Sequence, residues 1–321
     1  MDIQYLLFLQ NIRNAAGGVL TPIMLMISHL ATIGAGVLCV VIYWGIDRET
    51  GAWVIINTML GFLTNNLLKL TACVYRPWIR DPRIVPPEAA LRTATGYSFP
   101  SGHTQFAASS FGSLAQRCGR ERKALYGFCG AMIVLSAFSR NYLGVHTPQD
   151  VIVAILCSFV IIKIGVVVES KIQKNPSLLT VVFLTSCAAA IACAVYFHFK
   201  SYPMNYEDGH LIVDPGAMKA DGYSSVGAVL GTMAGMMLEK RFVQFRTDGP
   251  VFYRVIRVLM GLPAPAAAYL FCRRPLYYAV GVDRGHLILF ALIALYAMWI
   301  YPAIFTAVRK RLLSAREKES V

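Results

Sequence analysis

The chain has 321 residues, of which 56% are apolar and 15% are charged, whereas soluble domains are typically about 45–50% apolar and about 25% charged. This composition predicts an integral membrane protein and excludes a disordered chain, a disulfide scaffold and an ordinary cytosolic enzyme. The formal net charge is +13, from 30 Lys and Arg against 17 Asp and Glu. The cations lie between apolar stretches instead of forming one basic domain, which favours anionic lipid or an anionic substrate over nucleic acid.

The N-terminal residues and the cysteines predict no signal peptide and no metal site. Within residues 1–19, the apolar patch 5–9 is too short to span a bilayer and lacks the flanks of a signal peptide. We expect an interfacial helix here. The eight cysteines lie mostly in apolar runs without a C-x-x-C pair, so they predict neither zinc nor a disulfide framework.

Nine apolar stretches approach the roughly 20 residues that a helix needs to cross a bilayer. They predict an all-α, polytopic helical bundle, and they cover residues 20–46, 52–74, 103–117, 123–142, 148–168, 177–199, 223–238, 251–271 and 286–307. The third is rich in hydroxyl and amide side chains and the seventh is short and Gly-rich, so we expect other helices to enclose both. Pro263 and Pro265 predict a kinked or broken helix in the eighth.

Lys and Arg are concentrated in every second connection. These basic connections contain Arg117, Arg120, Arg122 and Lys123, then Lys171 and Lys174, then Lys240, Arg241 and Arg246, and finally the tail from Arg309 to Lys318. If each stretch crosses the membrane, all of them fall on one side, which the positive-inside rule makes cytoplasmic. Segment 75–102 then lies outside, yet it carries four arginines, an excess that predicts a functional role.

Three short motifs place ionisable groups at the predicted outer ends of the spans. They consist of Lys69 with Arg76-Pro77, then Pro100-Ser101-Gly102-His103, and then Ser139-Arg140 with His146 and Asp150. Ionisable groups at a membrane edge are costly and therefore indicate function. Cations that converge near a helix N-terminus favour a dianion, which points to a phosphate group.

Each motif also has a purely structural interpretation. Lys69 can extend to the lipid headgroups, and Arg76-Pro77 can end a helix. Ser101 can cap the following helix. Thr147 and Asp150 fit a capping box, which is compatible with catalysis because it would fix the local geometry.

The combination is more specific than its parts. Asp150 follows His146 by four residues, so its carboxylate can accept from one ring nitrogen and leave the other as a nucleophile or base. His103 supplies a second acid–base group. A nucleophile, an acid–base group and several cations are what phosphoryl transfer through a covalent enzyme intermediate requires.

In order and internal spacing, segments 69–77, 100–103 and 139–150 resemble the three signature motifs of the type 2 phosphatidic acid phosphatase (PAP2) superfamily. The resemblance implies a helical membrane lipid phosphate phosphatase that needs neither a metal nor another cofactor. It also implies a six-helix core formed by the first six spans. We therefore expect residues 20–200 to form the catalytic core and residues 201–321 to add three transmembrane helices and a basic cytoplasmic tail.

The resemblance implies a role for each motif residue. His146 would attack phosphorus to form a phosphohistidine, and Asp150 would orient it. His103 would protonate the leaving oxygen and later activate water. The groups that would hold the phosphate oxygens are Lys69, Arg76, Ser101, the backbone N–H of Gly102, and Arg140.

The expected activity is hydrolysis of the terminal phosphate of a lipid mono- or diphosphate at the outer membrane face. Phosphatidic acid, phosphatidylglycerol phosphate, undecaprenyl diphosphate and sphingoid phosphates share this group, and the motifs do not choose among them. Two alternatives use the same cations: an anionic-lipid transporter or binding protein, and a lipid phosphotransferase. The pairing of His146 with Asp150 disfavours a pure binding protein, since binding alone does not need a tuned imidazole. The expected location is a bacterial plasma membrane, because the loops are short and lipidation and retention signals are lacking. The sequence predicts no particular oligomeric state.

The remaining histidines are interpreted as structural. His29 and His286 lie in or beside apolar spans, whereas His198 and His210 lie near the acidic residues of segment 199–222. A metal site in that segment is disfavoured, because the ligand spacing is not tight and the chemistry above requires no ion.

Overall fold

The computed structural model of the protein describes residues 2–119, 122–207 and 209–319, with side chains as far as residue 311. Arg120, part of a predicted basic connection, lies outside the described residues. The regular secondary structure of the described chain is helical apart from one small hairpin, formed by β1 (Tyr206–Glu207) and β2 (His210–Leu211). The predicted all-α fold is confirmed.

The helices follow one another in chain order with short connections. The N-terminal part contains α1 (Asp2–Ala15), α2 (Thr21–His29), η1 (Leu30–Gly34), α3 (Ala35–Val41), η2 (Ile42–Ile46), α4 (Arg48–Ala72), α5 (Pro77–Arg80) and α6 (Glu88–Leu91), where η marks a π-helical turn. The middle part contains α7 (Gly102–Cys118), α8 (Lys123–Tyr142), α9 (Pro148–Lys174) and α10 (Leu178–Phe199). The C-terminal part contains α11 (Pro215–Leu238), η3 (Glu239–Val243), α12 (Val251–Gly261), α13 (Pro263–Ala267), η4 (Ala268–Cys272), α14 (Arg273–Val280), α15 (Val282–Leu295), η5 (Tyr296–Ile300) and α16 (Tyr301–Glu319).

Polar caps determine where the helices that carry the motifs begin. Asp47 caps α4, and Ser101 caps α7 by accepting from a backbone N–H three residues on. Thr147 caps α9, and Asp150 completes the capping box that the sequence predicts. Each cap satisfies an N–H group that the first helical turn leaves without an intrahelical partner. The first turns of α7 and α9 are thereby fixed next to the motif residues.

Five helical segments of the described chain are long and apolar enough to cross a membrane. They are Thr21–Ile46, Pro148–Lys174, Leu178–Phe199, Val251–Val280 and Val282–Arg311. The other predicted spans coincide with α4, α7, α8 and α11, which do not reach the same combination of length and apolarity. The chain is an integral membrane protein of several spans. Of the four other helices, α4, α7 and α11 are largely buried, whereas α8 lies at the edge of the bundle.

The two largest of the three hydrophobic clusters among the described residues connect the helices of the bundle. The larger cluster joins the first span, α4 and α7 to the C-terminal helices through residues such as Trp44, Phe111 and Tyr301. The second joins α4, α10 and α11 through Leu70 and Phe197. Helix α11, the stretch expected to be short, has 24 residues and is largely buried. It therefore packs as a central helix of the bundle.

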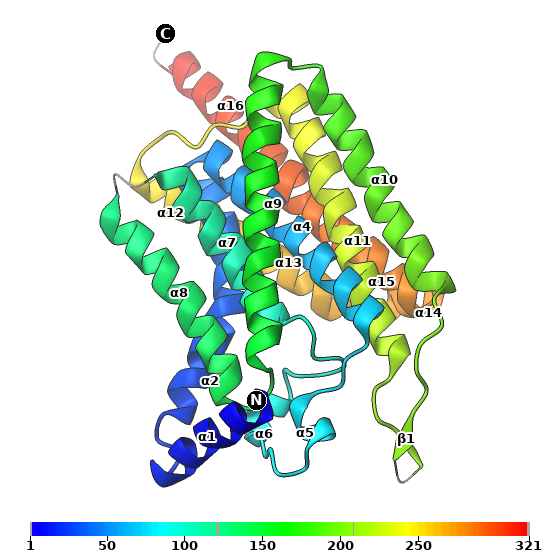
Figure 1. Ribbon diagram of the computed structural model, residues 1–321. Coiled ribbons are helices and arrows are strands. Elements are labelled where there is room, and N and C mark those ends of the chain that lie inside the picture. Colours follow the sequence, from blue (N-terminus) through cyan, green and yellow to red (C-terminus); the bar gives the residue numbers. More distant parts are fainter. Residues whose placement is uncertain (1, 120–121, 208, 320–321) are drawn as a thin grey trace.

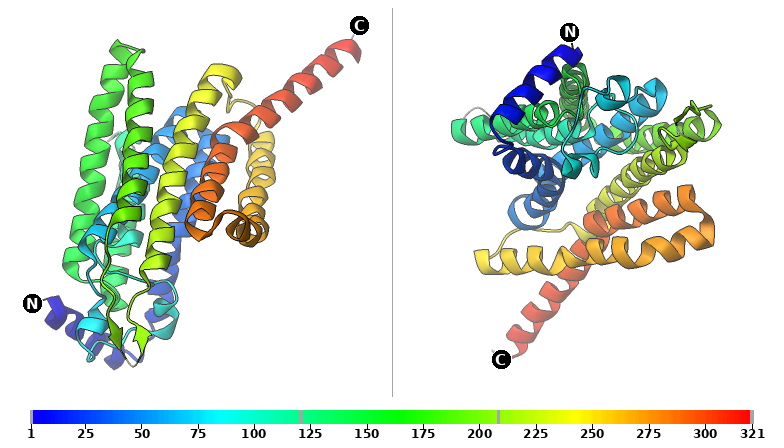
Figure 2. Two further views of the ribbon diagram at one scale, coloured as in Figure 1. Left: turned by 90° about the vertical axis from the view of Figure 1, so that its right-hand side faces the viewer. Right: turned by 90° about the horizontal axis from the view of Figure 1, so that it is seen from below.

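The ends of the motif-bearing helices meet at one end of the bundle, the lower end in Figure 1. There α4 and α8 end and α7 and α9 begin, and α1, α5 and α6 lie across this end. The C-terminus lies at the opposite end, as both side views show (Figures 1 and 2). The predicted basic connections that follow α7, α9 and α11 are at that opposite end as well.

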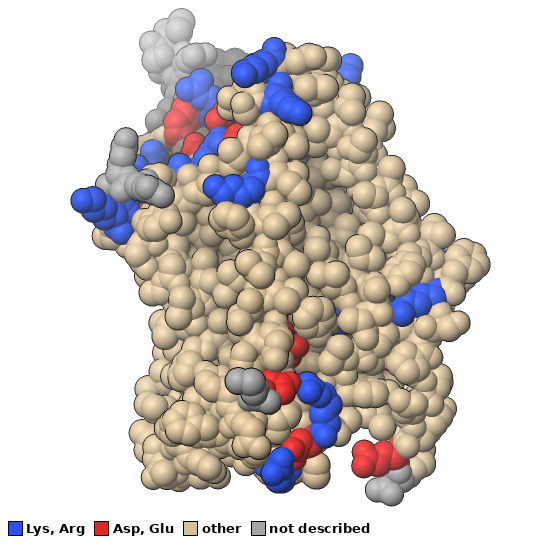
Figure 3. All heavy atoms as spheres, in the orientation of Figure 1, with Lys and Arg blue, Asp and Glu red and all other residues tan. Residues whose placement is uncertain are grey.

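Charged side chains gather towards the two ends of the bundle. On the face drawn in Figure 3, a broad band between the ends is almost free of Lys, Arg, Asp and Glu. Charges in the hydrocarbon region are expensive, so this band is where a bilayer fits.

The segment from α12 to α14, which contains Pro263 and Pro265, lies beside α15 (Figure 2). The first helix of this segment, α12, ends at Gly261, just before the two prolines.

Candidate active site

The three motifs converge at the lower end of the bundle, although they come from different helices and loops. The residues of the set that are buried, each no more than 8% exposed, are Lys69, Arg76, Ser101, Arg140, His146 and Asp150. His103 and Gly102, in the first turn of α7, are partly exposed. Fixed charges are seldom buried unless they are paired or used, so this concentration identifies the candidate site.

The hydrogen bonds of His146 fix its tautomer. The guanidinium Nη1 of Arg76 lies 2.8 Å from the Nε2 atom of His146. A guanidinium has only donors, so Nε2 must accept and carries no proton. The ring proton is then on Nδ1, which lies 3.3 Å from Oδ2 of Asp150. This arrangement leaves the Nε2 lone pair directed towards the cations.

Asp150 is oriented by a small hydrogen-bond network. Its Oδ2 atom accepts from the Ser98 hydroxyl at 2.6 Å and from the backbone N–H of Thr147 at 2.9 Å. The carbonyl oxygen of His146 accepts from Nδ2 of Asn141 at 2.8 Å. Neither Ser98 nor Asn141 was identified from the sequence alone. Only their proximity to motif residues in the sequence could have indicated a role for them.

Arg76 and Lys69 anchor the loop that faces the site. Arg76 donates to the carbonyl oxygens of Thr95, Gly96 and Val145, at 2.9 to 3.0 Å. Lys69 Nζ donates to the carbonyl oxygen of Tyr97 at 3.1 Å. Both cations therefore have fixed positions before any ligand binds, which reduces the reorganisation that binding requires.

Arg140 retains unused donors. Its Nη1 donates to the Ser28 hydroxyl at 2.7 Å, whereas its Nε and Nη2 atoms are buried without a hydrogen-bond partner among the described residues. Leaving buried donors of a charged group unpaired is strongly unfavourable. This guanidinium is therefore built to receive an anion.

The buried charges of the site do not balance. Among the motif residues, the buried cations are Lys69, Arg76 and Arg140, and the buried carboxylate is Asp150. Asp221 of α11, outside the motifs, also lies close enough to Lys69 for their charges to interact. Positive charge therefore remains in excess. A phosphate dianion offsets more of this excess than a phosphodiester, which carries one negative charge. Three fixed cations around a terminal phosphate also match the donors that stabilise phosphoryl transfer.

Electrostatics favour the neutral form of His146. Burial, reinforced by the neighbouring cations, lowers the pKa of the imidazole well below its usual range. Burial also lowers the pKa of Arg76 to about 10, against the attraction of Asp150. At neutral pH the guanidinium thus stays charged while the imidazole stays neutral, the combination that a nucleophilic histidine in a cationic site requires.

Ser101, Gly102 and His103 form the start of α7. The hydroxyl of Ser101 accepts from the Thr104 N–H at 3.4 Å, and its backbone N–H donates to the Asp150 carbonyl oxygen at 3.0 Å. Ser101 thus has the capping role, and its predicted contact with phosphate stays a prediction. His103 lies close enough to His146 for their charges to interact.

The other arginines of segment 75–102 form ion pairs of their own. Arg80 pairs with Asp2 at 3.0 Å, and Arg83 pairs with Asp81 at 2.7 Å. Arg92 pairs with a glutamate one turn earlier on the exposed surface. The cationic excess of this segment therefore contributes one side chain, Arg76, to the buried site.

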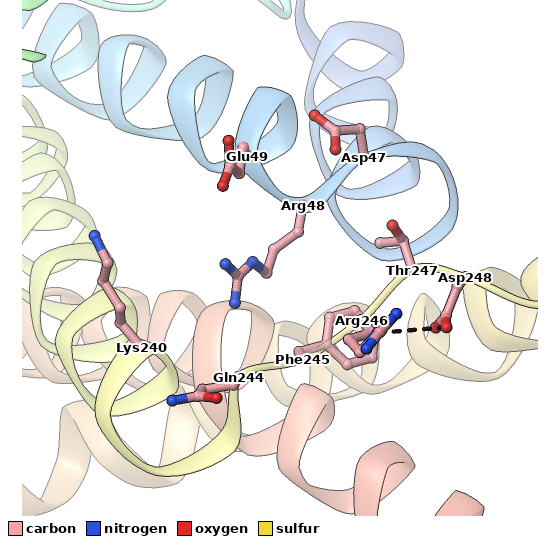
Figure 4. Close-up of a pocket in the computed structure, with 9 residues that line it drawn as sticks. All are labelled: Asp47, Arg48, Glu49, Lys240, Gln244, Phe245, Arg246, Thr247 and Asp248. Carbon is pink, nitrogen blue, oxygen red and sulfur yellow. Dashed lines mark ion pairs between the residues drawn. The ribbon is translucent and has the colours of Figure 1, made fainter. Parts of the chain in front are cut away.

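Two cavities differ in their relation to this site. A cavity of about 150 Å³ adjoins His103, and its lining residues are Thr32, Gly61, Phe62, Asn65, Gly102, His103, Gln105 and Phe106. A larger one, of about 690 Å³, lies at the other end of the bundle, between the start of α4 and the loop after η3 (Figure 4). Its Arg246 pairs with Asp248 at 3.4 Å, and none of the motif residues lines it.

Of the residues that the structure describes, no three His, Cys, Asp or Glu are grouped to hold a metal ion.

Comparisons with known proteins agree with the motif pattern. The PAP2 superfamily profile matches residues 50–174, and the profile described as PAP2 superfamily phosphatase, transmembrane extension, matches residues 223–315. Phosphatidylglycerophosphatase B of Bacillus subtilis (strain 168) is 32% identical over 141 residues; the match covers 41% of this chain and 67% of that protein. No solved structure matches the chain significantly.

Proposed function

The chain belongs to the PAP2 superfamily and is a membrane lipid phosphatase, and we propose that it hydrolyses the terminal phosphate of a lipid phosphate through a phosphohistidine on His146. The observation that carries this proposal is the buried guanidinium of Arg140, with its unused donors, in a site with an excess of positive charge. Next to it, the unprotonated Nε2 of His146 is a nucleophile held in place.

The first half of the reaction transfers the phosphoryl group to the enzyme. Nε2 of His146 attacks phosphorus, an N–P bond forms, and the P–O bond to the lipid breaks. The bound phosphate dianion offsets the cations around His103, so that the ring can hold a second proton. His103 gives this proton to the leaving oxygen, so the lipid departs as an alcohol or, from a diphosphate, as a monophosphate. Asp150 stabilises the positive charge that develops on the imidazole. Arg76, which donates to Nε2 in the free enzyme, transfers that hydrogen bond to a phosphate oxygen.

The second half regenerates the enzyme. His103, now neutral, takes a proton from water as the oxygen attacks phosphorus, and the N–P bond breaks to release inorganic phosphate. The charges of Lys69, Arg76 and Arg140 stabilise the equatorial oxygens in both steps. In this scheme all acid–base and electrostatic roles belong to side chains of the chain, so we propose that the reaction needs no metal.

The proposed membrane orientation places the site on the outer face of a bacterial plasma membrane. The positive-inside rule supports it, because the basic connections and the C-terminus lie at the opposite end of the bundle (Figure 1). A lipid phosphate in the outer leaflet would present its phosphate at the depth of the site. We also propose that residues 20–200 form the catalytic core and residues 201–321 a membrane extension, with residues 1–19 at the interface.

The substrate class follows from the charge of the site and from the relative. The excess of positive charge favours a terminal phosphate dianion. The relative is named for the hydrolysis of phosphatidylglycerol phosphate, which carries such a group, as do phosphatidic acid, undecaprenyl diphosphate and sphingoid phosphates.

Phosphate release by detergent-purified protein tests the proposal. Each of these four lipids is supplied with EDTA present, and the His146→Ala variant is the control. We expect release from at least one lipid, and we expect it to disappear in the variant. Correctly folded protein that releases no phosphate, or release that requires an added metal, contradicts this account. Product analysis with an added alcohol acceptor separates hydrolysis from phosphotransfer.

A further inference from the structure

We propose that the cavity beside His103 receives the leaving alcohol of the substrate, and that Asn65 and Gln105 recognise a hydroxyl group on that alcohol. This inference rests on the proposed function and goes beyond it by assigning selectivity to two residues outside the motifs. It predicts a preference for a phosphomonoester of a polyol headgroup over a diphosphate.

The position of the cavity follows from the geometry of the reaction. The attacking and leaving atoms are roughly in line through phosphorus, so the leaving group departs on the side away from His146. The acid that protonates the leaving oxygen must lie on that same side. His103 lines the cavity and His146 does not. The cavity is therefore on the leaving-group side of the site.

The amide groups of the cavity suit a hydroxyl. Asn65 Nδ2 donates to Oε1 of Gln105 at 2.9 Å and to the Pro100 carbonyl oxygen at 3.3 Å. Gln105 is 1% exposed, and its Nε2 is buried without a hydrogen-bond partner among the described residues. Oδ1 of Asn65 faces the start of α7, where a Cβ added to Gly102 would lie 3.4 Å from it. The pair thus offers one donor and one acceptor, and a hydroxyl can bond both.

The charge and size of the cavity disfavour a phosphate as the leaving group. None of the described residues that line it is Lys, Arg, Asp or Glu. The leaving phosphate of a diphosphate would bring negative charge into this cavity without a fixed cation to balance it. A volume of about 150 Å³ accommodates a small alcohol fragment, and Phe62 and Phe106 offer apolar contact to its CH groups. A phosphorylated glycerol headgroup has this combination of one neighbouring hydroxyl and a short carbon chain. Its phosphodiester charge is separated from the leaving oxygen by that chain, whereas in a diphosphate the charge lies on the leaving phosphate itself.

The first test measures the selectivity of the unmodified protein with substrates that share their acyl chains. We compare kcat/KM for phosphate release from three lipids in mixed micelles: phosphatidylglycerol phosphate, its analogue with hydrogen in place of the headgroup hydroxyl, and diacylglycerol pyrophosphate. We expect kcat/KM for phosphatidylglycerol phosphate to exceed the value for each of the other two lipids by at least about tenfold. With the deoxy analogue, the buried N–H donor of Gln105 would lack a hydrogen-bond partner, which weakens binding. Equal values for the hydroxyl and deoxy lipids, or a preference for the pyrophosphate, overturn the inference. No release from any lipid would instead count against the proposed function.

The second test assigns the selectivity to residues. Gln105→Met and Asn65→Leu remove the amide groups with little change in volume, and we expect the hydroxyl-to-deoxy ratio to fall to about one. Asn66→Leu is the matched control: Asn66 is buried on the same helix and bonds the carbonyl oxygen of Phe62 at 3.1 Å, but does not line the cavity. We expect this variant to keep the wild-type ratio. A ratio that is unchanged in Gln105→Met and Asn65→Leu, or one that falls equally in Asn66→Leu, overturns the assignment.

Discussion

Arg140 reaches the site from α8, and one hydrogen bond to α2 orients it. The Ser28 hydroxyl, 2% exposed, accepts from Nη1 at 2.7 Å and leaves the other guanidinium donors free for a ligand. Ser28 is thus a positioning residue that acts through Arg140. The sequence offered no signal for it, because the contact joins residues 112 positions apart.

We expect Ser28→Ala to lower kcat/KM about two- to tenfold, the factor that corresponds to about 0.5–1.5 kcal/mol for one hydrogen bond. The measurement is initial-rate kinetics on the best lipid substrate, combined with Arg140→Lys in a double-mutant cycle. The two losses should be non-additive, because the residues act through one contact. Ser110→Ala is the control, since Ser110 is equally buried but bonds only its own helix. Additive losses would show that Ser28 does not act through Arg140.

The pH dependence of the site follows from the lowered pKa of His146. An unperturbed imidazole takes up a proton near pH 6.5; here protonation, which removes the nucleophile, is displaced to lower pH. We expect a histidine NMR titration, assigned with His146→Gln, to show the ring still neutral at about pH 6.5, where a free imidazole is half protonated. The unfolded chain binds this proton below about pH 6.5, so the folded protein should lose stability as the pH falls below that value. A midpoint at or above 6.5 would contradict the electrostatic account.

The motif residues could be predicted from the sequence because their chemistry and spacing are local. His146 and Asp150 are one helical turn apart, and Ser101 to His103 begin a helix. The partners that complete the site could not be predicted in this way. Ser98 and Asn65 contact it only because the fold brings separate segments together.

Helix starts were the most predictable feature of the elements, since caps are read from a few neighbouring residues. Helix α11 is a case in which the start of a helix was not predicted correctly. Its apolar part was expected at residues 223–238, and the helix begins earlier, at Pro215, where the side chain of Asp214 caps the first turn. Its glycines reflect packing: a Cβ on Gly227 or Gly231 would collide with the backbone carbonyl of Leu287 or Ala291 on α15.

We therefore expect Gly231→Val to force α11 and α15 apart and to lower the free energy of unfolding by about 1–3 kcal/mol. Reversible unfolding in mixed detergent micelles measures this change. Gly127→Val is the control, because Gly127 lies in the interior of α8 with no atom within 4 Å of an added Cβ. Equal stability of the two variants would mean that close approach of α11 and α15 does not contribute.

In the whole molecule, the C-terminal helices are attached to the first span. Tyr43 and Trp44 donate to the carbonyl oxygens of Met298 and Ala297, both at 2.9 Å, and Arg257 donates to that of Trp44 at 2.8 Å. Contacts between positions more than 200 apart leave no local pattern in a sequence. The positions and order of the helices could therefore be predicted, whereas their packing required the structure.

The proposed orientation predicts which surfaces meet the cell exterior. In a cysteine-free background, Arg92→Cys at the site end should react with a membrane-impermeant maleimide in intact cells. Lys174→Cys, at the end of α9, should react only after permeabilisation. Both positions are exposed in the structure, so accessibility within the protein does not limit labelling. The reverse pattern would place the site on the cytoplasmic face.

Trapping of the covalent intermediate tests the central claim most directly. Purified protein is mixed with a lipid substrate that carries a radiolabelled terminal phosphate and is quenched within milliseconds in alkali, where phosphohistidine survives and serine or threonine phosphate is lost. We expect an acid-labile label on the peptide that contains His146, which is absent from His146→Ala. Turnover with no such label on His146, or a label that persists in His146→Ala, would contradict the account.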